Sequence, residues 1–265
     1  MDSKIGEGEA VYAEERQQSI ADLVTQRGRL SVAELAKEYT VTTETVRRDL
    51  SSLERVGVIR RVHGGAVPAS TLTVLEVTLT ERDRENTEQK DRIARAALAF
   101  LPQAGGSVLL DAGTTTARLA THIPRDHRLT VVTNAVPIAA RLAGLATIEL
   151  HLLPGRVRST TQAAVGEDTV AALQVLRTDV AFIGTNGLSV GHGLSTPDHS
   201  EAAGKRAMVH GGQRVVVLAD SSKFGRESTV RFAEIKDIAV LITDSGIESR
   251  LLKTLHERDI EVVVA

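Results

Sequence analysis

From Asp91 to its end, the chain alternates short runs of aliphatic and β-branched residues with longer amphipathic stretches. Such alternation is typical of βαβ units, whose strands pair in parallel while helices cover the sheet. The predicted strands are residues 107–110, 129–133, 148–153, 180–183, 214–219, 238–243 and 260–264. The predicted helices are residues 92–101, 115–122, 136–145, 168–176, 201–210 and 247–257. We therefore expect an α/β domain with a mostly parallel sheet over residues 91–265.

Length and composition favour a cytoplasmic protein of two domains. At about 100–200 residues per domain, the 265 residues suggest two. The chain has no cysteine, which excludes disulfides, thiolate metal sites and cysteine redox sensors. It has no apolar run long enough to span a bilayer, and its polar start is unlike a signal peptide. The formal net charge is −2, so any surface for nucleic acid must be locally basic.

Three further helical patterns precede the α/β segment, at residues 15–26, from Ser31 onward and at 43–56. The second starts with a capping box, in which Ser31 accepts a backbone N–H and Glu34 reaches back to the cap. A two-stranded wing with its turn at Gly64 and Gly65 is predicted to follow. We expect a loose tail at residues 1–13, a DNA-binding domain at 14–68, a linker at 69–90 and a ligand-sensing domain at 91–265.

The third helix has the features of a recognition helix. Val46, Leu50 and Leu53 form its buried stripe, which leaves Arg47 and Arg48 on the exposed N-terminal part. That part of such a helix reaches base edges in the major groove, where arginine pairs with guanine. Asp49 is expected to pair with a neighbouring arginine, and His63 to contact a phosphate or to stabilise the wing turn. The candidate DNA-binding residues are Ser31, Thr42, Thr43, Glu44, Thr45, Arg47, Arg48, Arg60, Arg61, His63 and Gly64.

The first strand of the α/β segment ends in a candidate anion site. Asp111, Ala112 and Gly113 follow the strand, and three threonines then begin a helix. A helix N-terminus offers free N–H groups and a favourable dipole to an anion, and the threonine hydroxyls add donors. Polar residues at other strand ends point to the same crevice. The candidate ligand-binding residues are Asp111, Gly113, Thr114, Thr115, Thr116, Asn134, Gly155, Gly166, Asn186, Glu201, Lys205 and Lys223.

The motifs of both segments resemble one family. The string 45–50 followed by 57–66 resembles the signature of DeoR-type bacterial repressors, and strings such as 111–116, 131–134 and 218–225 resemble the sensor domain of that family. The resemblance covers about residues 14–245. It implies a winged helix-turn-helix joined to a sensor whose fold is similar to sugar-phosphate isomerases of the ribose-5-phosphate isomerase type. Pro154 and Gly155 stand where family members commonly carry two glycines.

The resemblance implies a repressor of a sugar-utilisation operon that binds operator DNA as a homodimer or homotetramer. A phosphorylated sugar is the expected effector, and fructose 1-phosphate is the first candidate. No cofactor is expected, and no metal, because the histidines at 151, 192 and 199 lack metal-ligand spacing. Two alternatives stay open. One is an isomerase-like enzyme, which would need a general base such as Asp111, Asp198 or Glu201. The other is an activator of the same family.

Overall fold

The computed structural model describes residues 13–27, 30–62, 64–68 and 78–265. The chain divides into two compact units, Met1–Leu72 and Thr73–Ala265. The expected tail, apart from Ala13, lies outside the described residues, as do His63 and residues 69–77 of the expected linker. No helix within the described ranges has the length and apolar character needed to cross a membrane.

The smaller unit contains the three predicted helices and a three-stranded antiparallel sheet, which includes the predicted two-stranded wing. Its helices are α1 (Ala13–Arg27), α2 (Val32–Glu38) and α3 (Thr43–Arg55), and its strands are β1 (Leu30–Ser31), β2 (Ile59–Val62) and β3 (Gly65–Pro68). The predicted capping box at Ser31 and Glu34 is present. Val46, Leu50 and Leu53 are buried against Ile20 and Leu35 from the other helices. The stripe predicted for α3 is therefore confirmed.

The short strand β1, which the sequence pattern did not predict, ties the wing to the helices. The sheet has the order β1-β3-β2, with Ser31 opposite Gly65. A Cβ atom on Gly65 would lie 2.1 Å from the carbonyl oxygen of Leu30, so only glycine fits there. Gly64 has a φ of +74°, a conformation that favours glycine in the turn. The two glycines thus serve different purposes, one for the turn and one for close strand contact.

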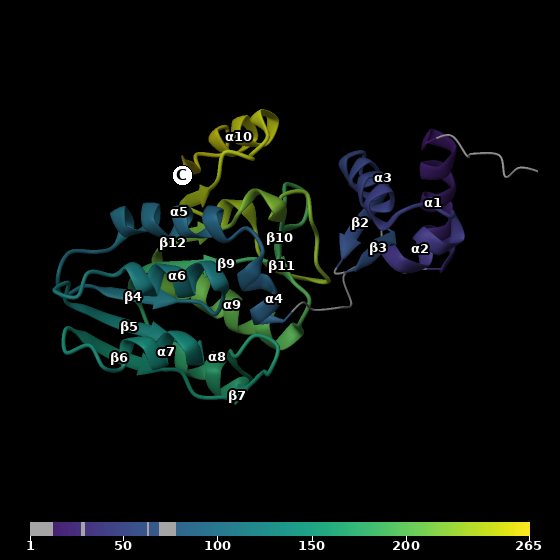
Figure 1. Ribbon diagram of the computed structural model, residues 1–265. Helices are drawn as coiled ribbons and strands as arrows, with labels where there is room; N and C mark the ends of the chain where they lie inside the picture. The colour runs from purple at the N-terminus through teal and green to yellow at the C-terminus, as the bar shows by residue number, and fades with distance from the viewer. Residues whose placement is uncertain (1–12, 28–29, 63, 69–77) are drawn as a thin grey trace, which may run out of the picture. The chain divides into compact units, whose positions relative to one another are not determined.

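The larger unit contains a seven-stranded parallel sheet of order β15-β14-β12-β9-β4-β5-β6 (Figure 1). The strands are β4 (Ser107–Leu110), β5 (Leu129–Thr133), β6 (Ile148–Leu152), β9 (Thr178–Gly184), β12 (Gly212–Leu218), β14 (Val240–Thr243) and β15 (Glu261–Val264). All seven were predicted, within a few residues at their ends. The chain runs from β4 outward to β6 and then returns to β9 on the other side of β4. The order of strands therefore reverses beside β4.

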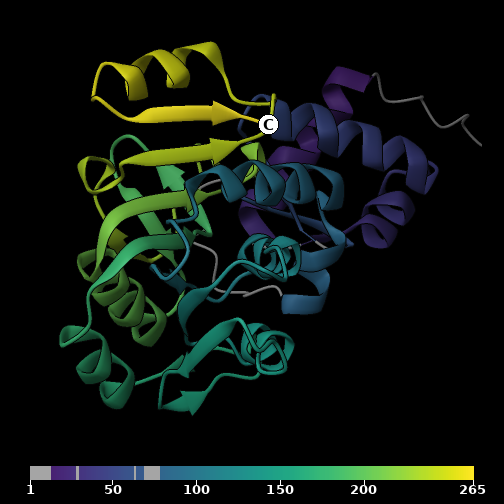
Figure 2. The same cartoon turned by 90° about the vertical axis from the view of Figure 1, so that its left-hand side faces the viewer.

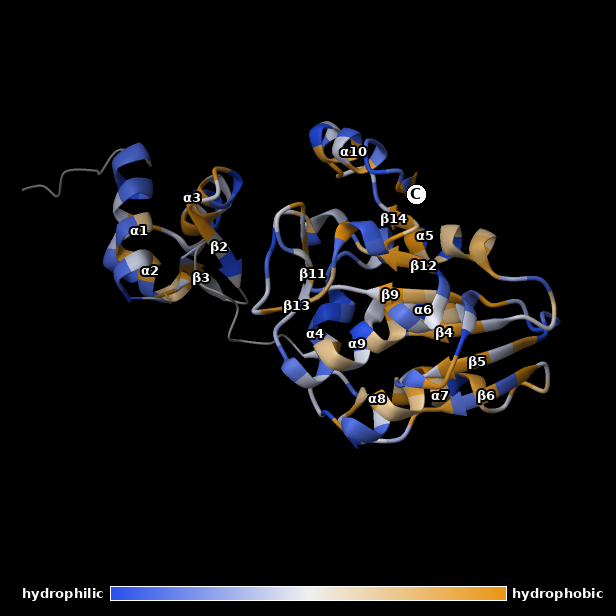
Figure 3. Cartoon of the chain, turned by 180° about the vertical axis from the view of Figure 1, so that it is seen from behind, coloured by the Kyte–Doolittle hydropathy of each residue, from blue (hydrophilic) through white to orange (hydrophobic). Residues whose placement is uncertain are grey.

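Helices cover both faces of this sheet because its strands alternate two sets of apolar side chains. They are α5 (Thr87–Ala97), α6 (Thr114–His122), α7 (Val136–Leu142), α8 (Glu167–Gln174), α9 (His199–Gly211) and α10 (Ser249–His256). In β9, Val180 and Phe182 join a core with α5, α6 and α7, whereas Ala181 and Ile183 join a core with α8, α9 and α10. In Figure 3 the strands between these two layers of helices are coloured mainly as hydrophobic, as expected for a sheet buried on both faces.

Smaller strands and turns complete the unit. A three-stranded antiparallel sheet is made of β10 (Gly187–Ser189), β11 (Gly193–Thr196) and β13 (Val230–Ala233), and a two-stranded one of β7 (Arg156–Val157) and β8 (Ala164–Val165). Short 3₁₀ turns are η1 (Leu98–Phe100), η2 (Ser221–Lys223) and η3 (Ile235–Asp237). Phe232 in β13 packs into the same core as α9.

Residues 78–90, which the sequence pattern placed in a linker, are instead helical and belong to the larger unit. Helix α4 (Leu79–Arg84) begins at a capping box of Thr78 and Glu81, and α5 follows it. Lys90 in α5 is 2% exposed. The charge run of this segment resembles a solvated helix face in sequence. In the folded protein part of this charged segment is buried. The buried ammonium of Lys90 donates hydrogen bonds to the backbone carbonyls of Arg82 and Glu85.

Candidate DNA-contact surface and ligand pocket

The exposed side of α3 presents two arginines. Arg47 and Arg48 have side chains that are 55% and 81% exposed. The carboxylate of Glu44 lies 3.7 Å from each guanidinium, and ion pairs so exposed are typically worth about 0–1 kcal/mol. Thr43 and Glu44 are exposed on the first turn of the same helix. The N-terminal half of α3 thus presents two guanidinium groups whose weak ion pairs with Glu44 can be exchanged for contacts with another molecule.

Ser31 and Thr42, both candidates for DNA contact, serve as helix caps. The hydroxyl of Ser31 accepts the amide of Glu34 at 3.1 Å, and that of Thr42 accepts the amide of Thr45 at 3.1 Å. The Thr42 hydroxyl also lies 2.9 Å from that of Thr45. Loss of such a cap typically costs about 1 kcal/mol. These residues therefore position α2 and α3 whether or not they also contact DNA.

Asp49 differs from the sequence-based interpretation. Its carboxylate pairs with Arg16 of α1 at 2.7 Å and also accepts a hydrogen bond from Gln17 at 2.9 Å. Asp49 is 3% exposed, on the side of α3 that packs on α1. The expected pairing with a neighbouring arginine of the recognition helix is wrong, because helical periodicity places residue 49 beside the buried stripe. The pair instead fixes α3 against α1.

The wing strand β2 returns along α3. The backbone amide of Arg61 donates to Glu54 at 2.9 Å, and its guanidinium donates to the hydroxyl of Ser51 at 2.9 Å. Arg61 therefore adds an exposed cation beside the C-terminal half of α3. The side chain of Arg60, like His63, lies outside the part of the chain that the structure describes. Gly64 forms the exposed wing turn.

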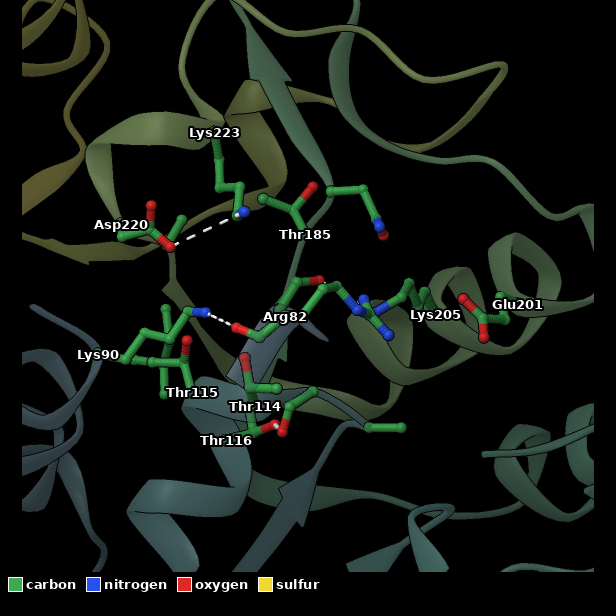
Figure 4. Close-up of a pocket in the computed structure, with 16 residues that line it drawn as sticks. Arg82, Lys90, Thr114, Thr115, Thr116, Thr185, Glu201, Lys205, Asp220 and Lys223 are labelled. Carbon is green, nitrogen blue, oxygen red and sulfur yellow. Dashed lines mark hydrogen bonds and ion pairs between the residues drawn. The ribbon is translucent and has the colours of Figure 1, made fainter. Parts of the chain in front are cut away.

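A pocket lies in the larger unit at the carboxyl ends of β4, β9 and β12 (Figure 4). It encloses about 540 Å³ of space, part of which is open to solvent. In open α/β sheets, ligands bind at the carboxyl ends of strands where the strand order reverses, and β4 and β9 flank that point here. The lining residues are Arg82, Lys90, Ala112, Gly113, Thr114, Thr115, Thr116, Gly184, Thr185, Asn186, Glu201, Lys205, Leu218, Ala219, Asp220 and Lys223.

The N-terminus of α6 forms one wall of this pocket. Thr116 donates its hydroxyl hydrogen to the carbonyl of Gly113 at 3.0 Å and so closes the first turn. Among the described residues, no hydrogen bond engages the hydroxyls of Thr114 and Thr115, although both residues are at most 9% exposed. The wall therefore presents two spare hydroxyls together with the positive end of the helix dipole.

Arg82 of α4 supplies further donors without partners. Its Nε and Nη2 atoms are buried, and no group of the described chain accepts a hydrogen bond from them. Leaving buried charged donors unpaired costs more than about 1–3 kcal/mol each. In Figure 4 the side chain of Arg82 lies between the threonines of α6 and Lys205. The arrangement calls for an acceptor, and an anion in the pocket would provide one.

Lys90 and Lys223 occupy the opposite side, next to Asp220. Burial, together with the smaller effect of the nearby charge of Lys223, lowers the pKa of Lys90 to about 8. Burial also lowers the pKa of Lys223, against the effect of Asp220, whose Oδ2 atom lies 3.9 Å from the ammonium. That Oδ2 atom has no hydrogen-bond donor within the described residues. This side thus offers two ammonium groups and one spare carboxylate oxygen.

Two ion pairs form the remaining wall. Lys205 pairs with Asp111 and donates to the carbonyl of Gly184 at 3.0 Å, while Asp111 accepts the amide of Gly184 at 2.9 Å. Glu201 accepts from Arg158 at 2.6 Å and from Thr161. Burial raises the pKa of Asp111, and Lys205 opposes that rise. Lys205 and Glu201 therefore line the pocket with charges that are already neutralised.

The pocket collects most, but not all, of the predicted ligand residues. Asn134 lies apart from the lining, because its amide bridges the backbone of Ala112 and Ala164 at 3.1 Å each. Gly155 and Gly166 are also absent from the lining, and a Cβ atom on Gly155 would lie 2.3 Å from the Thr169 hydroxyl. Asp111 lies behind Lys205. Some polar residues at strand ends therefore hold neighbouring loops together and do not face the pocket.

Sequence reasoning missed four polar lining residues. They are Arg82, Lys90, Thr185 and Asp220. The capping box at Thr78 and Glu81 was the available signal that a helix, and hence a tertiary position, begins before Arg82. Thr185 and Asp220 belong to sequence segments that were recognised as strand ends. Nothing in those segments indicates which of their polar residues faces the pocket.

Comparison with known proteins gives matches along nearly the whole chain. Residues 16–71 match the model of the DeoR-like helix-turn-helix domain, and residues 85–245 match that of the DeoR C-terminal sensor domain. The HTH-type transcriptional regulator GlpR of Haloferax volcanii is 36% identical over 249 residues, covering 94% of this chain and 96% of the relative. The putative aga operon transcriptional repressor of Escherichia coli O157:H7 is 32% identical over 260 residues, covering 98% and 96%.

Among solved structures, the chain is similar to ribose 5-phosphate isomerase A from Methanocaldococcus jannaschii. The identity is 17% and the TM-score is 0.39, over 53% of this chain and 55% of that chain. A likeness of this size carries no inference about ligand or activity.

Proposed function

Because the chain belongs to the DeoR family of transcriptional regulators, we propose that it represses a sugar-utilisation operon and leaves its operator when it binds a phosphorylated sugar. One observation carries the effector part of this proposal. The unpaired donors of Arg82 and the spare hydroxyls of Thr114 and Thr115 line the same pocket, at the N-terminus of α6. Together they form an anion-binding wall that nothing in the described chain neutralises.

The DNA part rests on α3 and the wing. Arg47 and Arg48 are assigned to base edges in the major groove, with Thr43 beside them on the first turn. Arg60 and Arg61 are assigned to phosphates, which supply affinity without sequence preference. The relative from Escherichia coli O157:H7 is named as a putative repressor, and that similarity favours repression over activation. The cytoplasm, where operator DNA lies, is the proposed compartment.

The sugar part of the effector would meet the opposite side of the pocket. The Oδ2 atom of Asp220 has no hydrogen-bond donor among the described residues, so it could accept a hydrogen bond from a sugar hydroxyl. Asn186 and Thr185 line the pocket nearby and add donors and acceptors. The phosphate then takes the end formed by Arg82 and α6, with Lys90 and Lys223 adding positive charge. Fructose 1-phosphate is the first sugar phosphate to test.

The three carboxylates that could act as a general base are engaged by other groups of the protein, which argues against an isomerase-like enzyme. A general base must be able to reach a substrate proton. Asp111 is held by Lys205 and by an amide, and Glu201 is held by Arg158 and Thr161. Asp198 caps α9 by accepting the amide of Glu201 at 2.9 Å. Each candidate base is thus engaged in holding the fold.

Helix α4 gives the proposed route from pocket to DNA. It is the first helix of the larger unit, directly after the segment that leads from the DNA-binding unit. A phosphate that pairs with Arg82 would fix α4 in one position, and the state with DNA released would be the one that binds the ligand more tightly. Coupling of this kind is typically about 1–3 kcal/mol, which is a 5- to 150-fold change in DNA affinity.

The test combines ligand stabilisation with operator release. Sugar phosphates and the matching unphosphorylated sugars are screened by thermal shift, where a ligand at 100 times its Kd stabilises the protein by about 2.7 kcal/mol. Release is then followed by fluorescence anisotropy on an operator selected from random duplexes. Arg82→Met and Thr115→Val should bind the operator like the parent and release it poorly. Arg84→Met on α4 and Thr121→Val on α6 are matched controls outside the pocket and should respond normally.

Two outcomes would contradict the proposal. If Arg82→Met and Thr115→Val release the operator at the parent's ligand concentration, the effector binds elsewhere. If unphosphorylated sugars stabilise and release the protein as well as their phosphates do, the anion-binding wall has no role in sensing.

A further inference from the structure

Strand β6 lies at an open margin of the seven-stranded sheet. It pairs with β5 on one side, and no described strand pairs with its other side. Figure 1 shows β6 at the lower margin of the sheet, and Figure 2 shows β15 in yellow at the opposite margin, with α10 lying along it. Glu149, His151 and Leu152 are exposed. An exposed edge strand invites pairing with another chain unless something covers it.

The backbone of β6 fixes which groups an incoming strand would meet. Leu153 donates its amide to Thr133 of β5, and Thr147 accepts the amide of Leu129, so odd-numbered residues face β5. The even-numbered residues therefore direct their amides and carbonyls outward. The amide of Ile148 is engaged by Leu145 at 3.0 Å. The amides of Leu150 and Leu152 remain available for a new strand.

The side chains of β6 are self-complementary. The strand reads Ile148-Glu149-Leu150-His151-Leu152, so apolar and ionisable residues alternate symmetrically about its centre. An antiparallel copy centred on Leu150 places Glu149 opposite His151 of the second copy, and the same pair occurs twice. It also pairs Ile148 with Leu152, so that the outward backbone groups of even-numbered residues meet one another. Across two strands, a carboxylate can accept a hydrogen bond from an imidazole N–H, whereas two like charges are destabilising.

We propose that β6 is the surface through which two copies of this chain pair, edge to edge and antiparallel, with Leu150 on the twofold axis. A twofold interface requires a surface that complements itself, and the Glu149–His151 arrangement does so. Within one chain these two side chains are 3.3 Å apart and are 72% and 55% exposed, so both remain open to a second copy. Leu152, at 52% exposed, adds apolar area at the end of the strand.

The other margin offers the matched control. In β15, Glu261 donates to Ala239 and Ala265 donates to Thr243, so the amide of Val264 points outward like that of Leu152. Val264 is 47% exposed, close to the value for Leu152. Leu152→Pro and Val264→Pro therefore remove equivalent outward donors from the two margins, and each leaves the inner ladder of its strand intact.

The association state of the full chain is measured by analytical ultracentrifugation over a range of micromolar concentrations. Leu152→Pro and His151→Glu should each raise the dissociation constant at least about fivefold, the second because Glu149 would then face a glutamate. Val264→Pro should leave the constant unchanged. The double change E149K/H151E places a lysine opposite a glutamate, which restores an attractive pair, and it should therefore restore association. Circular dichroism checks that each variant is folded.

Three results would overturn this assignment. They are a parent protein that is monomeric throughout the range, dissociation caused by Val264→Pro but not by Leu152→Pro, and equal dissociation of His151→Glu and the E149K/H151E double variant. Because the His151 side chain is exposed, His151→Glu is the variant whose fold is expected to change least.

Discussion

The cationic side chains of α3 and those of the pocket differ in how the protein holds them. Arg47 and Arg48 are more than half exposed and pair loosely with one neighbour on their own helix. Lys90 and Lys205 are at most 6% exposed and are held by partners that are distant in sequence or on another helix. A charge on the surface costs the fold little and is available to a partner. A buried charge must first satisfy the fold, and only the remainder can serve a ligand.

The largest expected effect is on the stability of the pocket. Lys205→Met should lower the free energy of unfolding by about 3–5 kcal/mol, because it leaves Asp111 buried without its cation. The measurement is urea denaturation followed by circular dichroism. Lys223→Met is the control, since its nearest carboxylate oxygen is 3.9 Å away, and it should cost less than about 1 kcal/mol. If both variants lose the same small amount, the distinction between structural and spare pocket charges fails.

The next effect concerns operator binding by α3. Arg47→Ala and Arg48→Ala should each weaken binding to the selected operator by about 1–3 kcal/mol and relax the preference at one base pair, while leaving stability within about 0.5 kcal/mol of the parent. Arg27→Ala is the matched control, because this arginine of α1 is 54% exposed and pairs as loosely, with Glu38 at 3.8 Å. Unchanged affinity in both α3 variants, measured by anisotropy, would remove α3 from the DNA interface.

The effect that is smallest per unit of change is a pH dependence of stability from Lys90. Its pKa is about 8 in the folded protein and 10.5 ordinarily, so the unfolded chain binds this proton more tightly. Burying the charged form is destabilising below pH 8, and that penalty disappears as pH rises from 8 to 10.5. The parent should therefore gain stability relative to Lys90→Met over this window, by at most about 1.4 kcal/mol per pH unit. A flat difference between the two denaturation series would show that the ammonium is solvated.

The fold could be predicted largely because its signals are local. The stripe of Val46, Leu50 and Leu53 in α3 predicts a helix, and the apolar run at residues 108–110 predicts a buried strand, each from a few neighbouring residues. The exposure of Arg47 and Arg48 could be predicted for the same reason, since it depends only on the orientation of one helix, whereas their contact with DNA stays a prediction. The two-residue strand β1 has no such signal and depends on the close approach of Gly65 to Leu30.

The pocket was less predictable because its walls meet only in three dimensions. Arg82 and Asp220 are 138 positions apart in the chain, and no local pattern relates them. Asn134 shows the converse, because a polar residue at a strand end can as well join two loops as face a ligand. Asp49 is buried although it directly follows the exposed Arg48 in α3, so the charge of a residue alone does not report its exposure.

Helix α4 has no buried residue, and polar contacts tie it to its surroundings. Lys90 donates to the carbonyl of Arg82, Arg118 pairs with Asp83 at 2.7 Å, and the amide of Leu79 donates to Thr160 at 2.8 Å. Substitutions in α4 would therefore change how firmly it sits without disturbing either apolar core. If the effector binds as proposed, substitutions in α4 would change the effector concentration at which the protein responds while leaving the stability of the fold nearly unchanged.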